Sequence, residues 1–388
     1  MIVKLGDICS FQSGETPSKS NASYFSGDIP WITTVALNGL SIGEKAAVDW
    51  ITEKAIAESA AKIVPARSIM VGTRVGIGKV AINEIPMSTS QDIISLVGIN
   101  ESLWSKEYLC KFIQSKEKYL KSQARGATIK GIKIDVLASL SIPDVPLVSQ
   151  QKIVAILDKA QNILAAQRSQ LSALDDLIKA RFVEMFGDSE HNSRAWPIQP
   201  LDSLCSVGSS KRIYQNEQSA DGVPFWRISD LVSKMDTGVA DSGLFIPEEK
   251  YFELKQAGLV PIAGDILVTS RGTLGRCYIV QKEDRFYFQD GMISWLSNYA
   301  ESITPLYLQH LFTMNGFRKQ IDGMQAGSTV AYLSIAMLKK LRIMVPSKEA
   351  QIKFASFVTQ IDKSKSAIQK SLDETQLLFD SLMQQYFG

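Results

Sequence analysis

The sequence contains one long internal repeat, because short stretches of its first half recur in the same order about 200 residues later. Leu5–Ser10 (LGDICS) resembles Leu201–Ser206 (LDSLCS), and Ile29–Ile32 (IPWI) resembles Val223–Trp226 (VPFW). The offset drifts slowly along the chain, and each half ends in Phe-Gly. The 388 residues are therefore expected to fold as one unit built twice rather than as a single domain.

Within each half, turn formers separate short strand-like runs from two helical patterns. Thr304 and Pro305 supply an N-cap and a first-turn proline for one of these helices. The order of elements predicts an α+β module of about 145 residues. The expected helices are Glu53–Ala61, Lys106–Ser122, Glu248–Ala257 and Pro305–Ile321, and the expected strands include Ile69–Val71, Lys79–Ile82, Ile266–Val268 and Cys277–Val280.

The composition changes after Pro146 and again after Pro346, where Gly and Pro are absent for about 40 residues. Both segments carry the a/d heptad frame of a coiled coil, interrupted by a few polar seam residues such as Gln167 and Lys365. An ordinary long helix lying on its own module is the alternative. Chain geometry favours an antiparallel helix pair, because the first helix must deliver the chain to the second module. The predicted apolar seam is Ile153, Leu157, Leu164, Leu171 and Ile178 with Phe354, Val358, Ile361, Leu372 and Phe379.

The predicted fold class is therefore α+β with a pseudo-two-fold repeat. Two similar modules are separated by two long antiparallel coiled-coil helices, with one module expected at each end of the pair. The first module is expected at residues 1–146, the first helix at 147–187, the second module at 188–346 and the second helix at 347–388.

Composition limits the location and the partners. A net charge of +2 neither demands nor forbids nucleic acid, so positive charge would have to gather on one face or come from a partner. No apolar run reaches the roughly 20 residues of a membrane span, and the first residues lack a signal-peptide pattern. We therefore expect a cytoplasmic protein with no membrane partner. The four cysteines form no C-x-x-C pair and are expected to be reduced, small buried residues.

The sequence gives little support for chemistry of its own. The Asn/Asp-Pro-Pro-aromatic tetrapeptide of adenine methyltransferases does not occur. Gly72–Lys79 has one residue too many for a phosphate loop, and a strand-like run follows it where a dinucleotide fingerprint requires a helix. His191 and His310 stand at non-matching positions, which favours neither a catalytic triad nor a zinc cage. We expect no catalytic residue, no metal and no cofactor.

The ordered motifs resemble the specificity (S, HsdS) subunit of type I restriction–modification enzymes over the whole chain. The resemblance implies a non-catalytic, DNA-binding subunit of a restriction system whose two target recognition domains each read one half of a split double-stranded DNA site. It also implies helices that dock methyltransferase (M) subunits, expected to be two, and restriction (R) subunits that join through the complex. The motifs are Thr16-Pro17, Ile29-Pro30-Trp31, Thr73-Arg74, Gln91-Asp92 within a strand and Arg125–Thr128 in the first half, then Val223-Pro224-Phe225, Ser270–Arg276, Gln289 and Gly327–Thr329 in the second.

Two departures from the family pattern affect single residues. Val75-Gly76 stands where the family loop reads Gly-Thr, so this loop is expected to sit differently from its counterpart. The second half has Ser209–Tyr214 where the first has Thr16-Pro17. Because recognition domains differ in what they read, the transfer of single residues between the halves is not expected to hold here.

The shared arginines, Arg74 and Arg271, lie in matching Gly/Thr-rich turns. A guanidinium can fork onto phosphate or onto guanine. Because both halves keep the arginine, a structural or phosphate role is favoured over base reading. The loops that follow the second helix either anchor phosphates or form helix C-caps on Gly126 and Gly327. Their candidate contacts are Arg125, Thr128, Lys130, Ser328 and Thr329.

Base readers should lie where the halves diverge, although any single one of them can instead be a solvated loop residue. Trp31 and Trp226 are expected in the core rather than as stacking platforms. The candidates are Thr16, Ser18, Lys19, Asn21, Tyr24, Thr33 and Thr34 in the first module, and Lys211, Arg212, Tyr214, Asn216, Arg227 and Ser229 in the second.

Two other functions remain to be separated from a DNA-recognition scaffold. A nuclease, or a fragment of a fused restriction–modification enzyme, would need a catalytic domain for which two similar halves leave no residues. A stand-alone repressor would need a helix-turn-helix, and no clear one is present.

Overall fold

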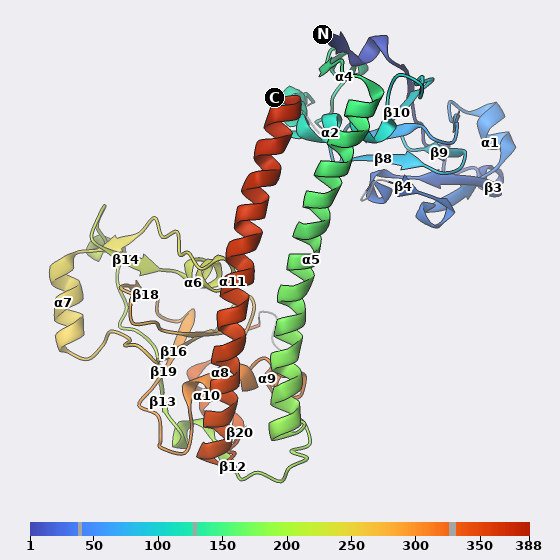
Figure 1. The fold of residues 1–388 in the computed structure, drawn as a ribbon. Coiled ribbons are helices and arrows are strands. Elements are labelled where there is room, and N and C mark those ends of the chain that lie inside the picture. Colours follow the sequence, from blue (N-terminus) through green and yellow to red (C-terminus); the bar gives the residue numbers. More distant parts are fainter. Residues whose placement is uncertain (38–40, 127–129, 326–330) are drawn as a thin grey trace. The chain divides into compact units, whose positions relative to one another are not determined.

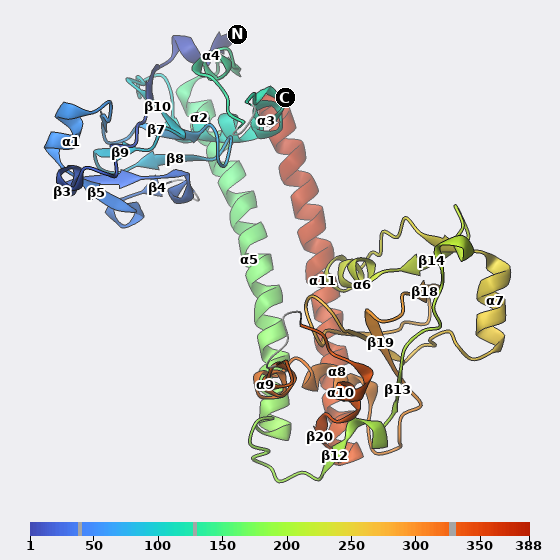
Figure 2. The same cartoon turned by 180° about the vertical axis from the view of Figure 1, so that it is seen from behind.

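The structure is a computed structural model that describes residues 1–37, 41–126, 130–325 and 331–388. Its contacts divide the chain into two compact units (Figures 1 and 2). Unit 1 comprises residues 1–168 with 370–388, and unit 2 comprises residues 169–369. Each unit therefore joins one module to the start of one long helix and the end of the other.

The first module contains a five-stranded sheet (order β2-β10-β7-β8-β4), a four-stranded sheet (β5-β3-β9-β6) and the pair β1-β11 among its described residues. The pairs β3·β9 and β4·β8 are parallel, and the others are antiparallel. Strands β7, β8 and β9 are buried at every residue, which explains the unbroken apolar runs Ile69–Val71 and Val80–Ile82. The bounds are β1 Ile2–Lys4, β2 Ser10–Ser13, β3 Phe25–Ile32, β4 Ser41–Ile42, β5 Asp49–Ile51, β6 Ile63–Val64, β7 Ile69–Gly72, β8 Val80–Asn83, β9 Met87–Thr89, β10 Ile93–Val97 and β11 Ser141–Pro143.

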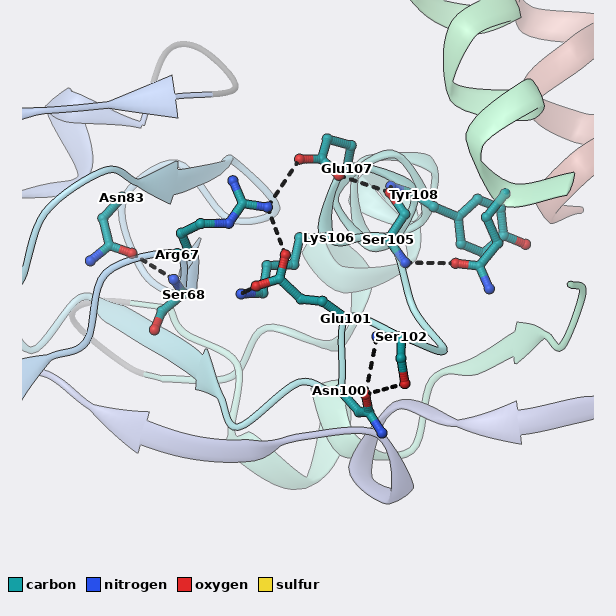
Figure 3. Close-up of polar contacts among 11 residues, drawn as sticks. Arg67, Ser68, Asn83, Asn100, Glu101, Ser102, Ser105, Lys106, Glu107 and Tyr108 are labelled. Atoms are coloured by element: carbon teal, nitrogen blue, oxygen red, sulfur yellow. Dashed lines mark hydrogen bonds and ion pairs between the residues drawn. The ribbon is translucent and has the colours of Figure 1, made fainter. Parts of the chain in front are cut away.

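Polar contacts tie the start of α2 to the turn before β7 (Figure 3). Arg67 Nη2 lies 2.8 Å from Glu101 Oε2, and Lys106 Nζ lies 2.6 Å from Glu101 Oε1. The hydrogen bonds from Arg67 and then Lys106 lower the pKa of Glu101 to about 2. Ser105 caps α2 by accepting a hydrogen bond from the backbone N–H of Tyr108 at 3.2 Å. The helices of this module are η1 Leu5–Asp7, η2 Ala22–Tyr24, η3 Thr34–Ala36, η4 Glu44–Ala46, α1 Glu53–Glu58, α2 Lys106–Ser115, α3 Glu117–Gln123 and α4 Ile134–Ala138.

The second module contains a four-stranded sheet (β13-β19-β16-β17), a three-stranded sheet (β15-β14-β18) and the pair β12-β20 among its described residues. The parallel pair β14·β18 repeats the parallel pair β3·β9 of the first module. The bounds are β12 Ile198–Pro200, η5 Leu201–Ser203, β13 Ser206–Gly208, η6 Gln215–Glu217, β14 Val223–Trp226, α6 Ile228–Thr237, β15 Phe245–Ile246, α7 Glu248–Gln256, β16 Ile266–Thr269, β17 Cys277–Ile279, β18 Tyr287–Phe288, β19 Ile293–Ser297, α8 Pro305–Leu311, α9 Asn315–Gly323, α10 Ile335–Lys339 and β20 Arg342–Met344.

Two sequence expectations need correction. The helices expected at Lys106–Ser122 and Pro305–Ile321 are each broken into two, α2 with α3 and α8 with α9. At each break a hydroxyl donates to the carbonyl three residues earlier, from Ser115 to Phe112 O at 2.6 Å and from Thr313 to His310 O at 2.7 Å. Such side chains compete with the helical backbone. The pairs Gln91-Asp92 and Gln289-Asp290 lie between strands rather than within one.

The cores hold the aromatic residues that the sequence assigned to them. Trp31 and Trp226 are each 5% exposed, and Trp226 stacks on Phe286 with ring centroids 3.7 Å apart. The core expectation for both tryptophans is confirmed. All four cysteines are free thiols, and burial raises the pKa of Cys9 and Cys205 to about 12. None of the described helices is long and apolar enough to cross a membrane.

The two long helices are α5 Leu147–Phe186 and α11 Lys348–Phe387, as their composition predicted. Every residue of both predicted heptad frames is buried or half-buried, the polar seam residues included. A fully buried glutamine lies in the first turn of each helix. Gln150 accepts from Ser105 N at 2.8 Å and donates to Leu103 O and Val145 O. Gln351 accepts from Thr304 N at 2.8 Å and donates to Ser302 O and Pro346 O.

Within each unit, the segments of α5 and α11 run side by side and antiparallel, which confirms the predicted pairing. In unit 1, Gln167 donates to Ser371 Oγ at 2.8 Å, and Phe387 packs on Tyr108 with centroids 5.1 Å apart. In unit 2, Asp175 and Lys365 form an ion pair at 2.5 Å. Phe186 packs there on Tyr307 at 5.0 Å, which mirrors Phe387 on Tyr108.

Candidate nucleic-acid interface

The two arginine loops have the same backbone frame. In the first module, Gly72 N donates to Lys79 O at 2.9 Å and Gly78 N to Gly72 O at 3.0 Å. In the second, the same bonds join Thr269 N to Arg276 O at 2.9 Å and Gly275 N to Thr269 O at 2.8 Å. The loops connect β7 to β8 and β16 to β17. Arg74 and Arg271 are exposed at equivalent places on this frame.

The tips of the loops differ, as the departure at Val75-Gly76 predicted. The residues with positive φ are Gly76 and Gly78 in the first module, but Gly272 and Gly275 in the second. Only the last glycine of each loop is common. A Cβ atom at Gly78 would lie 3.0 Å from Glu117, and one at Gly275 would lie 2.9 Å from Ile321. The positive φ favours glycine at both positions, and the close approach of α3 in the first module and of α9 in the second leaves little room for a side chain.

A second segment joins each arginine loop. Ile132 N donates to Thr73 O at 2.9 Å, and Leu333 N donates to Ser270 O at 3.0 Å. The stem of Arg74 crosses Gly131, where a Cβ would lie 2.8 Å from Arg74 Cγ. Arg271 instead lies over the ring of Tyr332, 5.2 Å from its centroid. Both arginines are thus held by the segment that follows the predicted phosphate loops.

Each module has a hollow beside its arginine. A hollow of about 640 Å³ in the first module is lined by Arg74, Arg125 and Lys133, with Asp135 as its carboxylate. Arg74 Nη1 also lies 3.6 Å from Asp92. The arginines predicted separately therefore converge, and they are joined by Lys133, which the sequence reasoning missed. The sequence signal that could have found Lys133 is the short basic cluster of Arg125, Lys130 and Lys133.

The hollow of the second module has about 370 Å³ and different neighbours. Arg212, Arg271, Gln289 and Asp290 line it. Arg212 Nε donates to Asp290 Oδ2 at 2.9 Å, and this hydrogen bond raises the pKa of Arg212 above its ordinary value. Arg212 comes from the divergent stretch and Arg271 from the shared loop, so the two kinds of candidate meet here.

The divergent stretch of the first module leaves β2 and is fastened to the sheet by Gly14 N, which donates to Ile93 O at 3.0 Å. The hydroxyl of Thr16 then donates to Gln91 Oε1. Asn21 caps η2 by accepting from Ser23 N at 3.1 Å, and Tyr24 OH points to Glu58 at 3.4 Å. Ser18 and Lys19 are exposed, and Thr33 is half-buried.

Thr34 needs correction as a candidate contact. Its side chain is 5% exposed, because η3 turns it toward the core beside Ala36. A groove of DNA has no access to a side chain buried in this way.

The candidates of the second module lie mostly on its surface. Lys211 is exposed, and its backbone N–H and C=O bond to Tyr287 OH at 2.8 and 3.1 Å. Tyr214 is 61% exposed, and Asn216 is exposed as well. Arg227 and Ser229 lie at the start of α6, where Asp230 accepts from Arg227 N at 2.8 Å.

The predicted phosphate loops are only partly within the described residues. Arg125 and Lys130 are exposed, and Arg125 bridges Gly131 through two backbone hydrogen bonds of 2.9 and 3.0 Å. Thr128, Ser328, Thr329 and Gly327 lie outside the described residues. The C-cap expectation for Gly126 is wrong, because α3 ends at Gln123 with Ala124 as its C-cap. Among the described residues, no group of three or more His, Cys, Asp or Glu side chains could hold a metal ion.

The fold and its two basic hollows define a tandem recognition scaffold, in which one module and one long helix occur twice. A family model described as the type I restriction modification DNA specificity domain matches residues 1–173 and 194–375. The chain belongs to this family, which comprises the non-catalytic DNA-recognition subunits of type I restriction systems.

Relatives extend over the whole chain. The chain is 27% identical over 413 residues to the MjaIX specificity subunit of Methanocaldococcus jannaschii, covering 98% of this chain and 91% of the relative. It is 32% identical over 162 residues to the EcoR124I/EcoR124II specificity subunit of Escherichia coli, covering 40% and 39%. Its fold is similar to the S subunit from M. genitalium, with a TM-score of 0.55 at 16% identity, covering 100% and 96%.

Proposed function

We propose that this chain selects the DNA target of a type I restriction–modification complex in the cytoplasm, and that each module reads one half of a split double-stranded site. One observation carries the proposal: the same arginine loop, on the same backbone frame, stands in both modules beside a stretch that differs. A backbone frame that both modules share is suited to binding phosphates, because phosphates are the same at every DNA sequence. A stretch that differs between the modules is suited to contacting bases. Arg74, Arg125, Lys130 and Arg271 are assigned to phosphates.

The long helices are proposed to dock M subunits, two to each chain, with R subunits joining through the complex. Leu177 of α5 and Leu378 of α11 occupy equivalent positions and are 46% and 56% exposed. We assign these two matched apolar side chains to two equivalent docking sites. The helices would then also set the distance between the two halves of the target.

The first test is reconstitution with the M subunit of the same host. The chain alone should neither methylate nor cut DNA. The complex should methylate adenines at a site with two specific parts and an unread spacer, which mapping of methylated adenines would reveal. Methylation of the same site by the M subunit without this chain would contradict the proposal.

Exchange of Glu15–Tyr24 for the matching stretch of a relative tests the modular reading. This stretch leaves the buried Trp31 and Thr34 in place. Only one half of the mapped target should change. A change in both halves would show that the modules do not read independently.

Deletion of one heptad within Gln161–Asp175 tests the spacing role of the helices. The shorter α5 should give a target with a shorter spacer, or a complex that no longer assembles. An assembled enzyme with an unchanged spacer would contradict this role.

A further inference from the structure

The turns that follow β9 in the first module and β18 in the second align differently by their backbone hydrogen bonds than by their sequences. Ser90 N donates to Ile32 O, and Gln289 N donates to Trp226 O, both at 2.9 Å. Gln289 is therefore the structural counterpart of Ser90 rather than of Gln91. The residue that follows, Gln91 in the first module and Asp290 in the second, is thus a position where the modules differ.

In both modules, the divergent stretch reaches this position. Thr16 donates its hydroxyl to the Gln91 side chain, and Arg212 donates Nε to Asp290 Oδ2 at 2.9 Å. The first pair is neutral and the second is a charged pair. The turn therefore belongs to the variable surface of each module, although its Gln-Asp letters look like shared framework.

The bond to Asp290 fixes the plane of the Arg212 guanidinium through its inner nitrogen. Among the described residues, neither terminal nitrogen of Arg212 has a protein hydrogen-bond partner, and the side chain is 64% exposed. Asp290 is 21% exposed and comes from the turn beneath it. Arg212 thus presents two oriented N–H₂ groups to solvent, and these groups can only donate hydrogen bonds.

The chemistry of such a fork selects among the bases. In the major groove, guanine offers two adjacent acceptors, O6 and N7, whereas adenine places a donor at N6 next to N7. Two parallel donors fit guanine and clash with the adenine donor. Arg271 lies in the same hollow, over the ring of Tyr332, and is the arginine that both modules share and that we assign to a phosphate. Arg212 is therefore available to contact a base.

We propose that Arg212, positioned by Asp290, reads a guanine in the half of the target that the second module recognises. The proposal rests on the proposed function, in which the second module reads one half-site. It also implies that the first module, with Thr16 and Gln91 at this place, has no matching arginine fork to demand a guanine there.

The experiment compares methylation maps of the full complex with wild-type chain and with Arg212→Ala. The wild-type map should contain one invariant G·C pair in one half of the site. In the variant this position alone should become degenerate, with a loss of discrimination of about 5- to 150-fold. The half read by the first module should stay unchanged, which also shows that the variant chain folds and assembles.

Two further changes separate base reading from charge. Arg212→Lys keeps the charge but cannot fork, so it should lose the guanine preference as Arg212→Ala does. In the wild-type complex, 7-deazaguanine at the invariant position removes the N7 acceptor and should lower binding, whereas Arg212→Ala should no longer sense it. Lys255→Ala, an exposed lysine on α7, is the matched control and should leave the map unchanged.

The outcomes are distinguishable. A map without a split site would contradict the proposed function itself. A split site whose every position keeps its selectivity in Arg212→Ala would overturn the guanine assignment. Equal loss of methylation at all sequences would also overturn it, because that result identifies Arg212 as a phosphate contact. Asp290→Asn should weaken the preference less than Arg212→Ala does, since the amide still accepts one hydrogen bond.

Discussion

The first and second modules close the same arginine loop with the same backbone hydrogen bonds, yet they line its surroundings with different side chains. Thr73 and Ser270 accept equivalent bonds from Ile132 and Leu333. Beside them stand a neutral pair in one module and the ion pair Arg212–Asp290 in the other. The backbone frame and the side chains around it therefore vary independently in this fold, so under the proposed function a new specificity would need no new core.

A second comparison concerns how the modules hold the long helices. The buried glutamine at the start of each helix and the buried phenylalanine at its end are the same in both units. At one matching place the modules differ: Lys111 is fully buried and pairs with Asp158 at 2.6 Å, whereas the second module has His310. Each of the following predictions tests whether matched residues behave alike.

The largest effect is expected at the helix ends. Phe186→Ala should lower the free energy of unfolding by about 3–5 kcal/mol, and Phe387→Ala should fall at the lower end of that range. Phe186 packs against three aromatic rings, while Phe387 packs against two. Urea titrations followed by circular dichroism measure both. Val183→Ala, at a half-exposed position of α5, is the control, and a loss below about 1 kcal/mol at Phe186 would contradict the packing described.

The buried glutamines should matter slightly less and equally in both units. Gln150→Leu or Gln351→Leu leaves one N–H and two carbonyl groups without partners, so each should cost about 2–3 kcal/mol. The same titration measures it, with exposed Gln151→Leu as the control. A loss in only one unit would break the equivalence of the two helix starts.

Much of this architecture could be predicted from sequence because it is periodic or repeated. The heptad frames of α5 and α11 gave the paired helices, and the collinear motifs gave two modules. The aromatic clusters around Phe182 and Phe186 were missed, since neither ring belongs to the a/d frame. The burial of Gln150 was also missed, because the sequence does not show whether a polar side chain at the start of a helix is buried.

The candidate site was predicted less well, because it depends on contacts between distant segments. The sequence could locate Arg74 and Arg125 but not their meeting in one hollow with Lys133. It also matched Gln91 to Gln289, and backbone bonds shift that match by one residue. Two identical residues in a turn are too short a match to align the two modules, whereas a backbone hydrogen bond to the neighbouring strand fixes which residues are equivalent.

The difference between Lys111 and His310 predicts a pH effect in unit 2. Burial, with Lys365 nearby, lowers the pKa of His310 to about 4, while Asp175 opposes the shift. In the unfolded chain His310 takes up a proton near pH 6.5, whereas in the folded chain it stays neutral until the pH approaches 4. The free energy of unfolding is therefore highest above pH 6.5 and falls as the pH drops toward 4. From pH 7 to pH 5 the loss should be about 2 kcal/mol. His310→Gln should lack this part of the loss, whereas the contribution of Asp362, whose pKa burial raises above its ordinary value, should remain. Identical pH profiles of the two proteins would contradict the prediction.

The smallest effect is expected at the shared arginines. Arg74→Gln and Arg271→Gln should each weaken binding of the complex by about 1 kcal/mol at every sequence and reduce the slope of log K against log salt by about 1. Titrations of target and unrelated duplexes over a range of salt measure both quantities, with Arg276→Gln, an arginine paired to Asp236, as the control. If either substitution instead changes the preference at one base pair, that arginine contacts a base. The proposed division between a shared phosphate-binding frame and a variable base-reading surface would then be wrong for that module. Equal behaviour of the two variants would show that the frame works alike in both modules, because Arg74 and Arg271 have different side-chain neighbours but the same backbone support.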